Sequence, residues 1–353
     1  MKQQKKLINS VITILIYIFF STQAAHGSQV SSSSLTTSNA QSTASSETKK
    51  RAAAKNLVIF GLLEVLLEHS VWEVSKRLGW LTTARYVLQD PNLPNKMRIK
   101  RTKVLTAVST EKPPFPAAGD DQGNLMSRIV FEQQAGIKKS EAAVKEINST
   151  ITRLAQDGFF CSVGEETLVT NLINTVDNPE VYIQCMKPVQ SAIALIELCL
   201  KNQNNELMIL SNFGVGMLGQ LQKTYPEVFK YFEAKNIIIA GDISEADRKE
   251  YFSSPLHVIK PGGPKGEIFR YIEARTGYRG EQITFIDNPK IDVEAAKQIC
   301  GWQSLQVTDG DFAPIQQALI SSGIISSEGS PRSSTQSSIP VPSTQSPVQQ
   351  PPV

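Results

Sequence analysis

The chain of 353 residues has little histidine, few cysteines and almost no excess charge. Its three histidines, His26, His69 and His257, are too few and its four cysteines show no metal-ligand spacing, so a zinc site is not expected. A formal net charge of +3 falls short of the basic face that nucleic-acid-binding proteins carry, so no nucleic acid partner is expected. These absences exclude classes of partner without naming one.

The apolar run near the start of the chain is shorter than the roughly 20 residues that a membrane-spanning helix needs. A basic stretch at 2–6 precedes this run at 7–20, and small residues at 25–27 offer a cleavage site. Residues 1–27 therefore have the pattern of a secretory signal peptide. We expect an exported protein, periplasmic or secreted, with an uncleaved membrane anchor as the alternative.

Export would carry the four cysteines into a compartment that permits disulfides. Four cysteines allow three pairings, and the sequence leaves open whether bridges form or the thiols stay free and buried. The residues are Cys161, Cys185, Cys199 and Cys300.

Two segments, one after the apolar run and one at the end of the chain, have few large apolar side chains. Residues 28–52 are rich in Ser and Thr, and residues 326–353 mix Ser, Pro and Gln. Such segments cannot offset the entropy of ordering their backbone, so a disordered linker and a disordered tail are expected.

The middle of the chain alternates apolar runs with helical patterns. The runs are nearly continuous in Val, Ile, Leu and Phe, as in strands covered on both faces. They lie at 56–60, 206–210, 236–240 and 282–286, and the helical patterns lie at 217–235, 266–276 and 292–300. This order predicts a doubly wound, Rossmann-like α/β fold with a parallel sheet.

The gap of residues 70–205 is too long for a simple crossover, so it predicts an inserted module. Helical periodicity at 138–154, 166–175 and 188–201 makes this module a mostly helical cap, with the core at 53–69 and 206–325. A basic cluster at 96–103 (KMRIKRTK) is interpreted as a solvated face, with an anionic partner or membrane surface as the alternative.

Ligands of an open parallel sheet bind at the carboxyl ends of its strands, so the residues there are the candidates for a site. Asp242, after the third run, is interpreted as a turn or helix-start residue, with a site role as the alternative. The other candidates are Gly61 and Leu63, Ser211 and Asn212, Lys260, and Asp287 with Asp292.

In the order of these strand-end residues along the chain, the sequence resembles the haloacid dehalogenase-like (HAD-like) superfamily. This superfamily consists mostly of phosphatases, and the resemblance covers about residues 56–307. FGLLEVLLE at 60–68 stands where the family carries Asp-x-Asp, so Gly61 replaces the nucleophile and Leu63 the acid/base aspartate. LSN at 210–212 matches the family's phosphate-binding Ser or Thr, and IDNPKIDVEAAK at 286–297 resembles its magnesium motif.

The resemblance implies a role for each later motif. Ser211, with Asn212 beside it, would hydrogen-bond a phosphoryl group, and Lys260 in Lys-Pro would balance its charge, with Lys265 as a competing assignment. Asp287 would be the principal Mg²⁺ ligand and Asp292 a supporting acid; Asn288 departs from the usual second aspartate of this motif.

Covalent phosphoryl transfer needs an in-line carboxylate, a second acid and a charge-balancing cation. Glycine and leucine supply neither acid, so no catalytic residue is intact and Mg²⁺ would be weakly held. Taken alone, FGLLEVLL also fits an ordinary core strand. The first hypothesis is an inactive, exported binding or interaction module for a small anion or a protein partner. The alternative is a weak or atypical Mg²⁺-dependent phosphatase.

Overall fold

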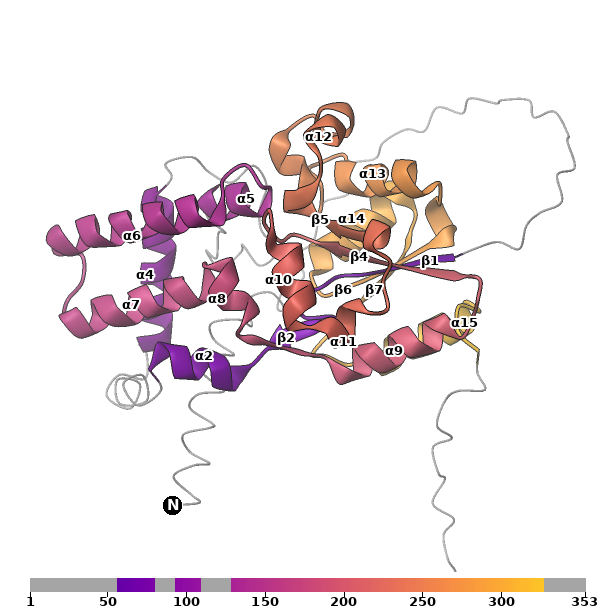
Figure 1. The fold of residues 1–353 in the computed structure, drawn as a ribbon, viewed down its shortest axis with the longest axis horizontal. Helices are drawn as coiled ribbons and strands as arrows, with labels where there is room; N and C mark the ends of the chain where they lie inside the picture. The colour runs from indigo at the N-terminus through magenta and orange to yellow at the C-terminus, as the bar shows by residue number, and fades with distance from the viewer. Residues whose placement is uncertain (1–55, 80–92, 109–127, 327–353) are drawn as a thin grey trace, which may run out of the picture.

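The structure, a computed structural model, describes three stretches of the chain, residues 56–79, 93–108 and 128–326. They form an α/β lobe around a sheet and a helical lobe beside it (Figure 1). The signal peptide predicted at 1–27, the linker at 28–52 and all but the first residue of the tail at 326–353 lie outside the described residues. Within those three stretches, no helix combines the length and the apolar character needed to cross a membrane.

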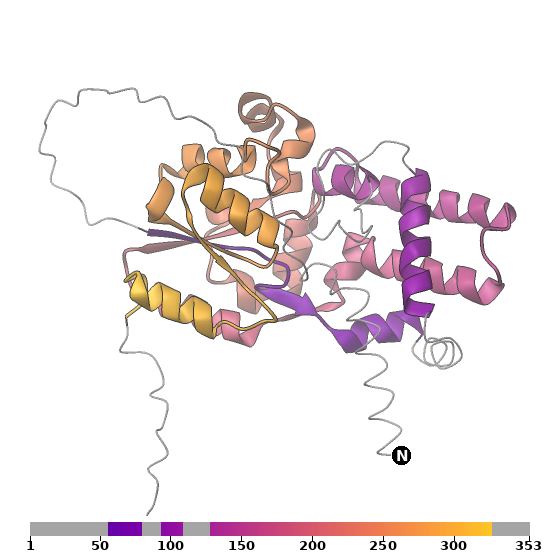
Figure 2. The same cartoon turned by 180° about the vertical axis from the view of Figure 1, so that it is seen from behind.

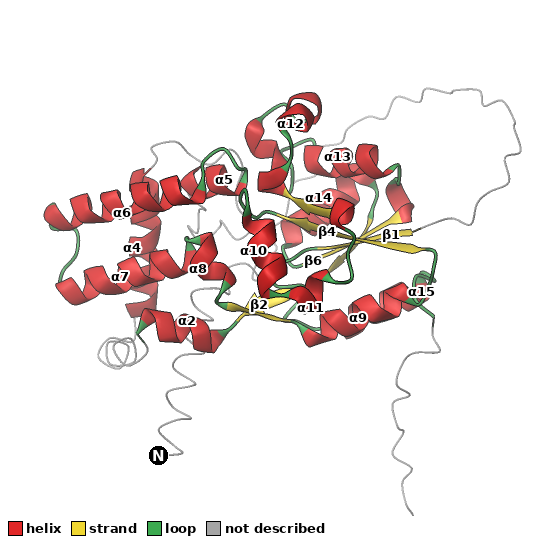
Figure 3. Cartoon of the chain, in the orientation of Figure 1, coloured by secondary structure: helices red, strands yellow, loops and turns green. Residues whose placement is uncertain are grey.

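A parallel sheet of five strands organises the α/β lobe (Figure 3). Its order is β5-β4-β1-β6-β7, so the first strand lies in the middle and later strands lie on both sides of it. The bounds are β1 Asn56–Phe60, β4 Asn205–Ser211, β5 Ile237–Ile239, β6 Ile283–Asp287 and β7 Gln303–Gln306. This order confirms the doubly wound, Rossmann-like sheet that the sequence predicts.

The central strand feeds two hydrophobic cores, because successive side chains of a strand point to opposite faces. Val58 and Phe60 pack with α9, α10, α11 and α15, whereas Leu57 and Ile59 pack with α13 and α14. Figure 2 shows the yellow helix α15 across the sheet from α14. The bounds are α9 Gln190–Leu200, α10 Met217–Thr224, α11 Pro226–Phe229, α12 Glu245–Tyr251, α13 Glu267–Thr276, α14 Lys290–Cys300 and α15 Ala313–Ser321.

The helical lobe comes from the long segment between β1 and β4 and forms the cap that the sequence predicts (Figure 1). Its helices bury apolar residues such as Leu105, Ile147 and Leu172 in a core of their own. Their bounds are α2 Val71–Leu78, α4 Leu93–Val108, α5 Arg128–Gln134, α6 Ser140–Gln156, α7 Val163–Val176 and α8 Pro179–Ile183.

Two short antiparallel strands, β2 (Leu67–His69) and β3 (Met186–Pro188), lie between cap and core. β2 runs into the first cap helix, and β3 leaves the last one for α9, which packs on the sheet rather than on the cap helices. The interval 70–205 assigned to the cap thus contains one helix of the core. We propose that the inserted module ends near residue 189.

Two elements differ from the predicted pattern. The single helix predicted at 217–235 is interrupted at Tyr225, where α10 ends and Pro226 starts α11. Proline lacks the N–H that a continuing helix would need and is well placed as a first helical residue. Strand β7 (QSLQ) escaped prediction because it has no apolar run, and its residues are only half-buried at the edge of the sheet.

The four cysteines are free thiols in the structure. Cys161 is exposed and the other three are buried. Burial raises the pKa of the Cys199 thiol to about 12 and that of Cys300 to about 11, so both stay protonated and unreactive.

The basic cluster at 96–103 lies on α4, and part of its charge is matched within the cap. Lys100 Nζ lies 2.7 Å from Glu165 Oε2, and Arg101 Nε donates to Asp177 Oδ2 at 2.8 Å. Lys100 and Arg101 thus pair with acids at the two ends of α7. These two residues are therefore neither fully solvated nor free to bind an external anion.

Candidate functional site

The carboxyl ends of three neighbouring strands meet at one edge of the sheet. β1 lies between β4 and β6, and Gly61, just after β1, donates its backbone N–H to Ile286 O at 2.8 Å. Because β4 and β6 end at Ser211 and Asp287, the structure brings three of the predicted positions together from distant parts of the chain.

Lys260 reaches the same edge from the loop before α13. Its backbone N–H donates to Asn212 Oδ1 at 2.9 Å. Its Nζ pairs with Asp287 Oδ2 and lies 3.6 Å from Oδ2 of Asp292, in the first turn of α14. These three charged side chains, Lys260, Asp287 and Asp292, are called the ion cluster below.

Asp287 fills the space that a side chain on residue 61 would need. A Cβ built on Gly61 would lie 2.1 Å from Asp287 Oδ1 and 2.7 Å from its Cγ, far inside van der Waals contact. Glycine is favoured at 61 because this carboxylate leaves no space for a side chain. Backbone conformation is not the reason, since the φ of Gly61 is not in the left-handed region. A carboxylate does lie at the tip of β1, but it belongs to the residue that the resemblance assigns to metal binding.

The ion cluster is shielded from water. The side chains of Lys260, Asp287 and Asp292 are 6%, 2% and 5% exposed. Asp287 Oδ1 accepts the backbone N–H of Asn288 at 2.9 Å while Oδ2 pairs with the lysine. Both oxygens of this carboxylate are thus engaged within the protein, which leaves it poorly placed as a nucleophile.

Two acids share one base in this cluster. Burial raises the pKa of both carboxyls, that of Asp292 to about 7, although Lys260 opposes the rise. Burial alone would lower the pKa of Lys260, but the two carboxylates outweigh it and raise the value. The cluster therefore keeps the lysine charged and holds one extra proton up to about neutral pH.

Leu63, the other vestigial position, takes no part in the cluster. Its half-buried side chain packs against the core on the α9 face, and its backbone bridges to Leu67. Glu64 follows with a positive φ of 58°, and its carboxylate pairs with His69. The acid nearest in sequence to the lost pair is therefore engaged elsewhere.

Three polar candidates have structural partners that their sequence pattern did not reveal. Asn212, predicted to bind phosphate, uses its side-chain oxygen to hold Lys260. Asn288 donates from Nδ2 to Val307 O at 3.1 Å. Asp242 Oδ1 accepts the N–H of Gly216 at 2.8 Å, in keeping with the turn interpretation. Ser211 is only 3% exposed at the end of β4.

Mg²⁺, which the resemblance implies, does not fit the residues present. The side chains of Gly61 and Leu63 offer no ligand oxygen, and the Lys260 ammonium already pairs with the acids that remain. Among the described stretches, no group of three or more His, Cys, Asp or Glu side chains is placed to hold a metal.

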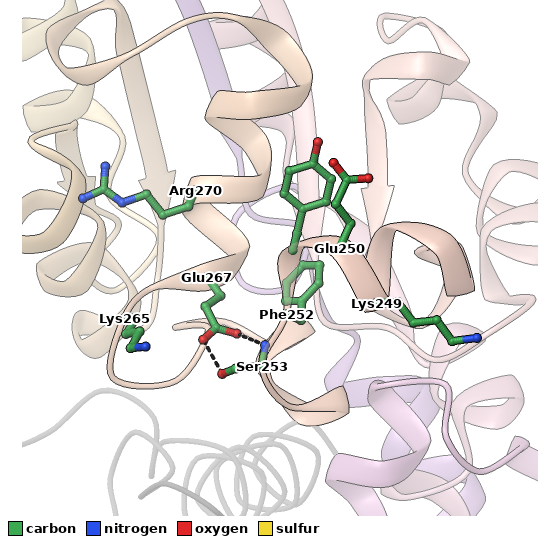
Figure 4. A pocket seen from close by; sticks show the side chains of 8 residues that line it. Lys249, Glu250, Phe252, Ser253, Lys265, Glu267 and Arg270 are labelled. Atoms are coloured by element: carbon green, nitrogen blue, oxygen red, sulfur yellow. Dashed lines mark hydrogen bonds between the residues drawn. The ribbon is translucent and has the colours of Figure 1, made fainter.

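A hollow of about 720 Å³ opens between α12 and α13 and contains none of the ion cluster (Figure 4). Lys265 lines it, whereas Lys260 lies in the ion cluster at the sheet edge. At its wall, Glu267 accepts hydrogen bonds from the Ser253 hydroxyl at 2.6 Å and the Ser253 N–H at 2.8 Å. These bonds tie the loop after α12 to the start of α13.

Replacing Gly61 with Ala should destabilise the protein by about 1–3 kcal/mol, because the new methyl group must displace the Asp287 carboxylate. Most of this loss should vanish in an Asp287→Ala background, which removes the atoms in conflict. Chemical denaturation of the two single variants and the double variant measures the coupling.

Gly219→Ala is the matched control, since a Cβ at Gly219 meets nothing within 4 Å. Gly219 lies within α10, where alanine should be neutral or slightly stabilising. Equal stability of wild type and Gly61→Ala would mean that Asp287 does not occupy the tip of β1.

Asp292→Asn should change how stability depends on pH. Between about pH 4 and pH 7 the folded protein keeps a proton on Asp292 that the unfolded chain has released, so its free energy of unfolding falls as pH rises. Relative to Asp292→Asn, wild type should lose up to about 1.4 kcal/mol per pH unit in this window and level off above it. Denaturant melts across pH test this, and parallel curves for the two proteins would contradict it.

No protein-family model matches the chain. No curated protein matches it either. Among solved structures, it is similar to a predicted HAD-like family hydrolase from Porphyromonas gingivalis, with 14% identity, a TM-score of 0.42, and 76% of this chain and 98% of that one covered. It is also similar to a HAD-family enzyme from Bacteroides thetaiotaomicron in complex with magnesium and inorganic phosphate, with 12% identity, a TM-score of 0.40, and 74% of this chain and 98% of that one covered.

The L-2-haloacid dehalogenase from Xanthobacter autotrophicus, with chloropropionic acid covalently bound, gives 16% identity, a TM-score of 0.38, and coverage of 76% of this chain and 84% of that one. Similarity at this level carries no information on activity, so we rely on the geometry of this chain. By its sheet order, its inserted helical cap and the meeting of its motif positions at one sheet edge, the chain has a Rossmann-like fold of the HAD-like type.

Proposed function

We propose that this chain is a non-catalytic binding or interaction module that keeps a HAD-like fold without phosphoryl-transfer activity. The observation that supports this most is the position of Asp287, whose carboxylate fills the place of a side chain on residue 61 and pairs with Lys260. The group nearest to the nucleophile position is thus held by an internal cation.

Two of the three chemical requirements of the reaction, the nucleophile and the second acid, lack a side chain at the positions that the resemblance assigns to them. Gly61 offers no nucleophile and Leu63 no proton, and losing the acid/base group alone typically lowers the rate by about 10² to 10⁴. The remaining acids and the lysine satisfy one another, so a phosphate ester would have to break a buried ion pair before binding. The missing nucleophile, the missing acid and the buried ion pair would each lower the rate of phosphoryl transfer.

Of the two partner classes, a protein surface is better supported than a small anion. An anion would need Lys260, yet this lysine is 6% exposed and faces two carboxylates. Bringing a further negative group to a site that already has two carboxylates and one lysine is electrostatically unfavourable. Inorganic phosphate should therefore leave the melting temperature unchanged.

Export remains part of the proposal on sequence grounds. The basic start, apolar run and small residues of 1–27 support a signal peptide. The module would then meet its partner in the periplasm or outside the cell.

A phosphatase assay tests the proposal. With a generic phosphate monoester and Mg²⁺, wild type and Asp287→Asn should both show no turnover above the buffer background, because Gly61 offers no nucleophile and the carboxylate beside it, Asp287, is held by Lys260. Asp242→Asn serves as the matched control, since it changes an acid at a neighbouring strand end that binds Gly216.

The alternative is a weak Mg²⁺-dependent phosphatase that uses Asp287, whose carboxylate lies at the tip of β1. Mg²⁺-dependent turnover that Asp287→Asn abolishes and Asp242→Asn retains would establish this alternative and end the proposal. Equal activity in all three preparations would point to a contaminating enzyme, and in that case repurified protein should show none.

A further inference from the structure

Helix α5 is shared between the two lobes, and it lies where the cap meets the α/β lobe (Figure 1). Ile129, in its first turn, is buried in the core of the cap. Phe131 and Ala135, the residue just after the helix, are buried in the sheet core together with Leu210 and Ala240. Residues two apart on a helix point to nearly opposite sides, and residues four apart point to the same side. One face of α5 thus belongs to the cap and the other to the sheet.

The end of α5 meets two strand-end loops of the core through glycines. A Cβ built on Gly136 would lie 2.4 Å from Gly241 O, and one built on Gly214 would lie 2.8 Å from Gln133 O. Gly214 and Gly241 follow β4 and β5, and the Gly241 N–H donates to Phe213 O at 3.0 Å, which ties the two loops together. Cap and core therefore approach more closely here than side chains at these glycines would allow.

This close contact buries polar atoms that have no partner. Gln133 and Ser140 are 3% and 8% exposed, and Gln133 Nε2 and Ser140 Oγ make no hydrogen bond within the described stretches. Ser140 starts α6, and its Oγ would lie 3.7 Å from a Cβ on Gly214, so the unpaired hydroxyl lies at the same contact. A buried polar atom without a partner costs free energy. The apolar and backbone contacts of α5 outweigh this cost in the folded protein.

We propose that α5 is a permanent joint that fixes the cap on the core, so that the two lobes separate only when the whole protein unfolds. Separation would expose Phe131 and Ala135, which are buried among side chains of the sheet core. It would also break the close backbone contact at Gly136 and Gly214. The joint does not depend on whether the chain catalyses a reaction.

A fixed cap keeps the sheet edge that carries the ion cluster closed. Gly214 lies three residues beyond Ser211, the last residue of β4, so the joint lies next to the strand ends that converge on Asp287. A binding partner would therefore meet one rigid surface made of both lobes, and the sheet edge would stay out of its reach.

Native-state hydrogen exchange on the full chain tests the joint. The Ala135 N–H donates to Phe131 O at 2.8 Å on the cap side, and the Gly241 N–H donates to Phe213 O on the core side. Their protection factors should lie within about tenfold of those of the β1 amides, because all of them exchange through the same global unfolding. If Ala135 and Gly241 both exchange faster than this relative to β1, the joint opens by itself and the proposal fails.

Two substitutions should change the joint in opposite directions. Gly214→Ala should lower the protection of the α7 amides in the cap about tenfold, because its methyl group must displace Gln133. Ser140→Ala should raise the same protection about threefold, because it removes a buried hydroxyl that has no partner. A change in a core loop would thus alter the stability of a cap helix.

Gly219→Ala and Ser149→Ala are the matched controls. A Cβ on Gly219 meets nothing within 4 Å, and Ser149 is an exposed residue of α6 whose hydroxyl donates to Lys145 O at 2.9 Å. Both variants should leave the protection of α7 unchanged. A Gly214→Ala variant with unaltered α7 protection, or a Ser140→Ala variant in which this protection does not rise, would overturn the joint.

Discussion

A lysine held between two buried carboxylates is the constraint on which this sheet edge depends. Lys260 is fixed by Asn212 at its backbone and by Asp287 and Asp292 at its ammonium. Removing either member of the Lys260–Asp287 pair would strand a buried charge, at a cost of about 3–5 kcal/mol. The carboxylate that pairs with the lysine also occupies the space that a side chain on residue 61 would need. One interaction therefore holds the edge together and, in the function we propose, takes the place of phosphoryl-transfer chemistry.

The cap and the sheet have separate hydrophobic cores, so other contacts must hold the two lobes together. Each lobe buries its own apolar residues, and β2 and β3 supply the two strands that pass between them. The polar groups of this ribbon, from Glu64 to Tyr182, are satisfied by one another rather than by a ligand. The protein thus has two polar clusters with different exposure: a buried one at the sheet edge and a partly exposed one at the connectors.

The fold could be predicted from the sequence because parallel strands that are buried on both faces have nearly continuous apolar sequences. The four runs all became strands of the large sheet, whereas QSLQ, half-buried at the edge, carried no such signal. The convergence of Gly61, Ser211 and Asp287 followed from strand order. What could not be predicted was the direction of side chains: Asn212 could equally face a ligand, and nothing in the sequence places the Asp287 carboxylate over Gly61.

In the function we propose, internal ion pairing takes the place of external ligands at the sheet edge. Calorimetric titration of the protein with Mg²⁺ at neutral pH tests it most directly, since Mg²⁺ requires the oxygens that Lys260 now occupies. The account predicts no saturable binding at this edge, and identical traces for wild type and Asp287→Asn. Binding at one site per chain that Asp287→Asn abolishes would contradict it.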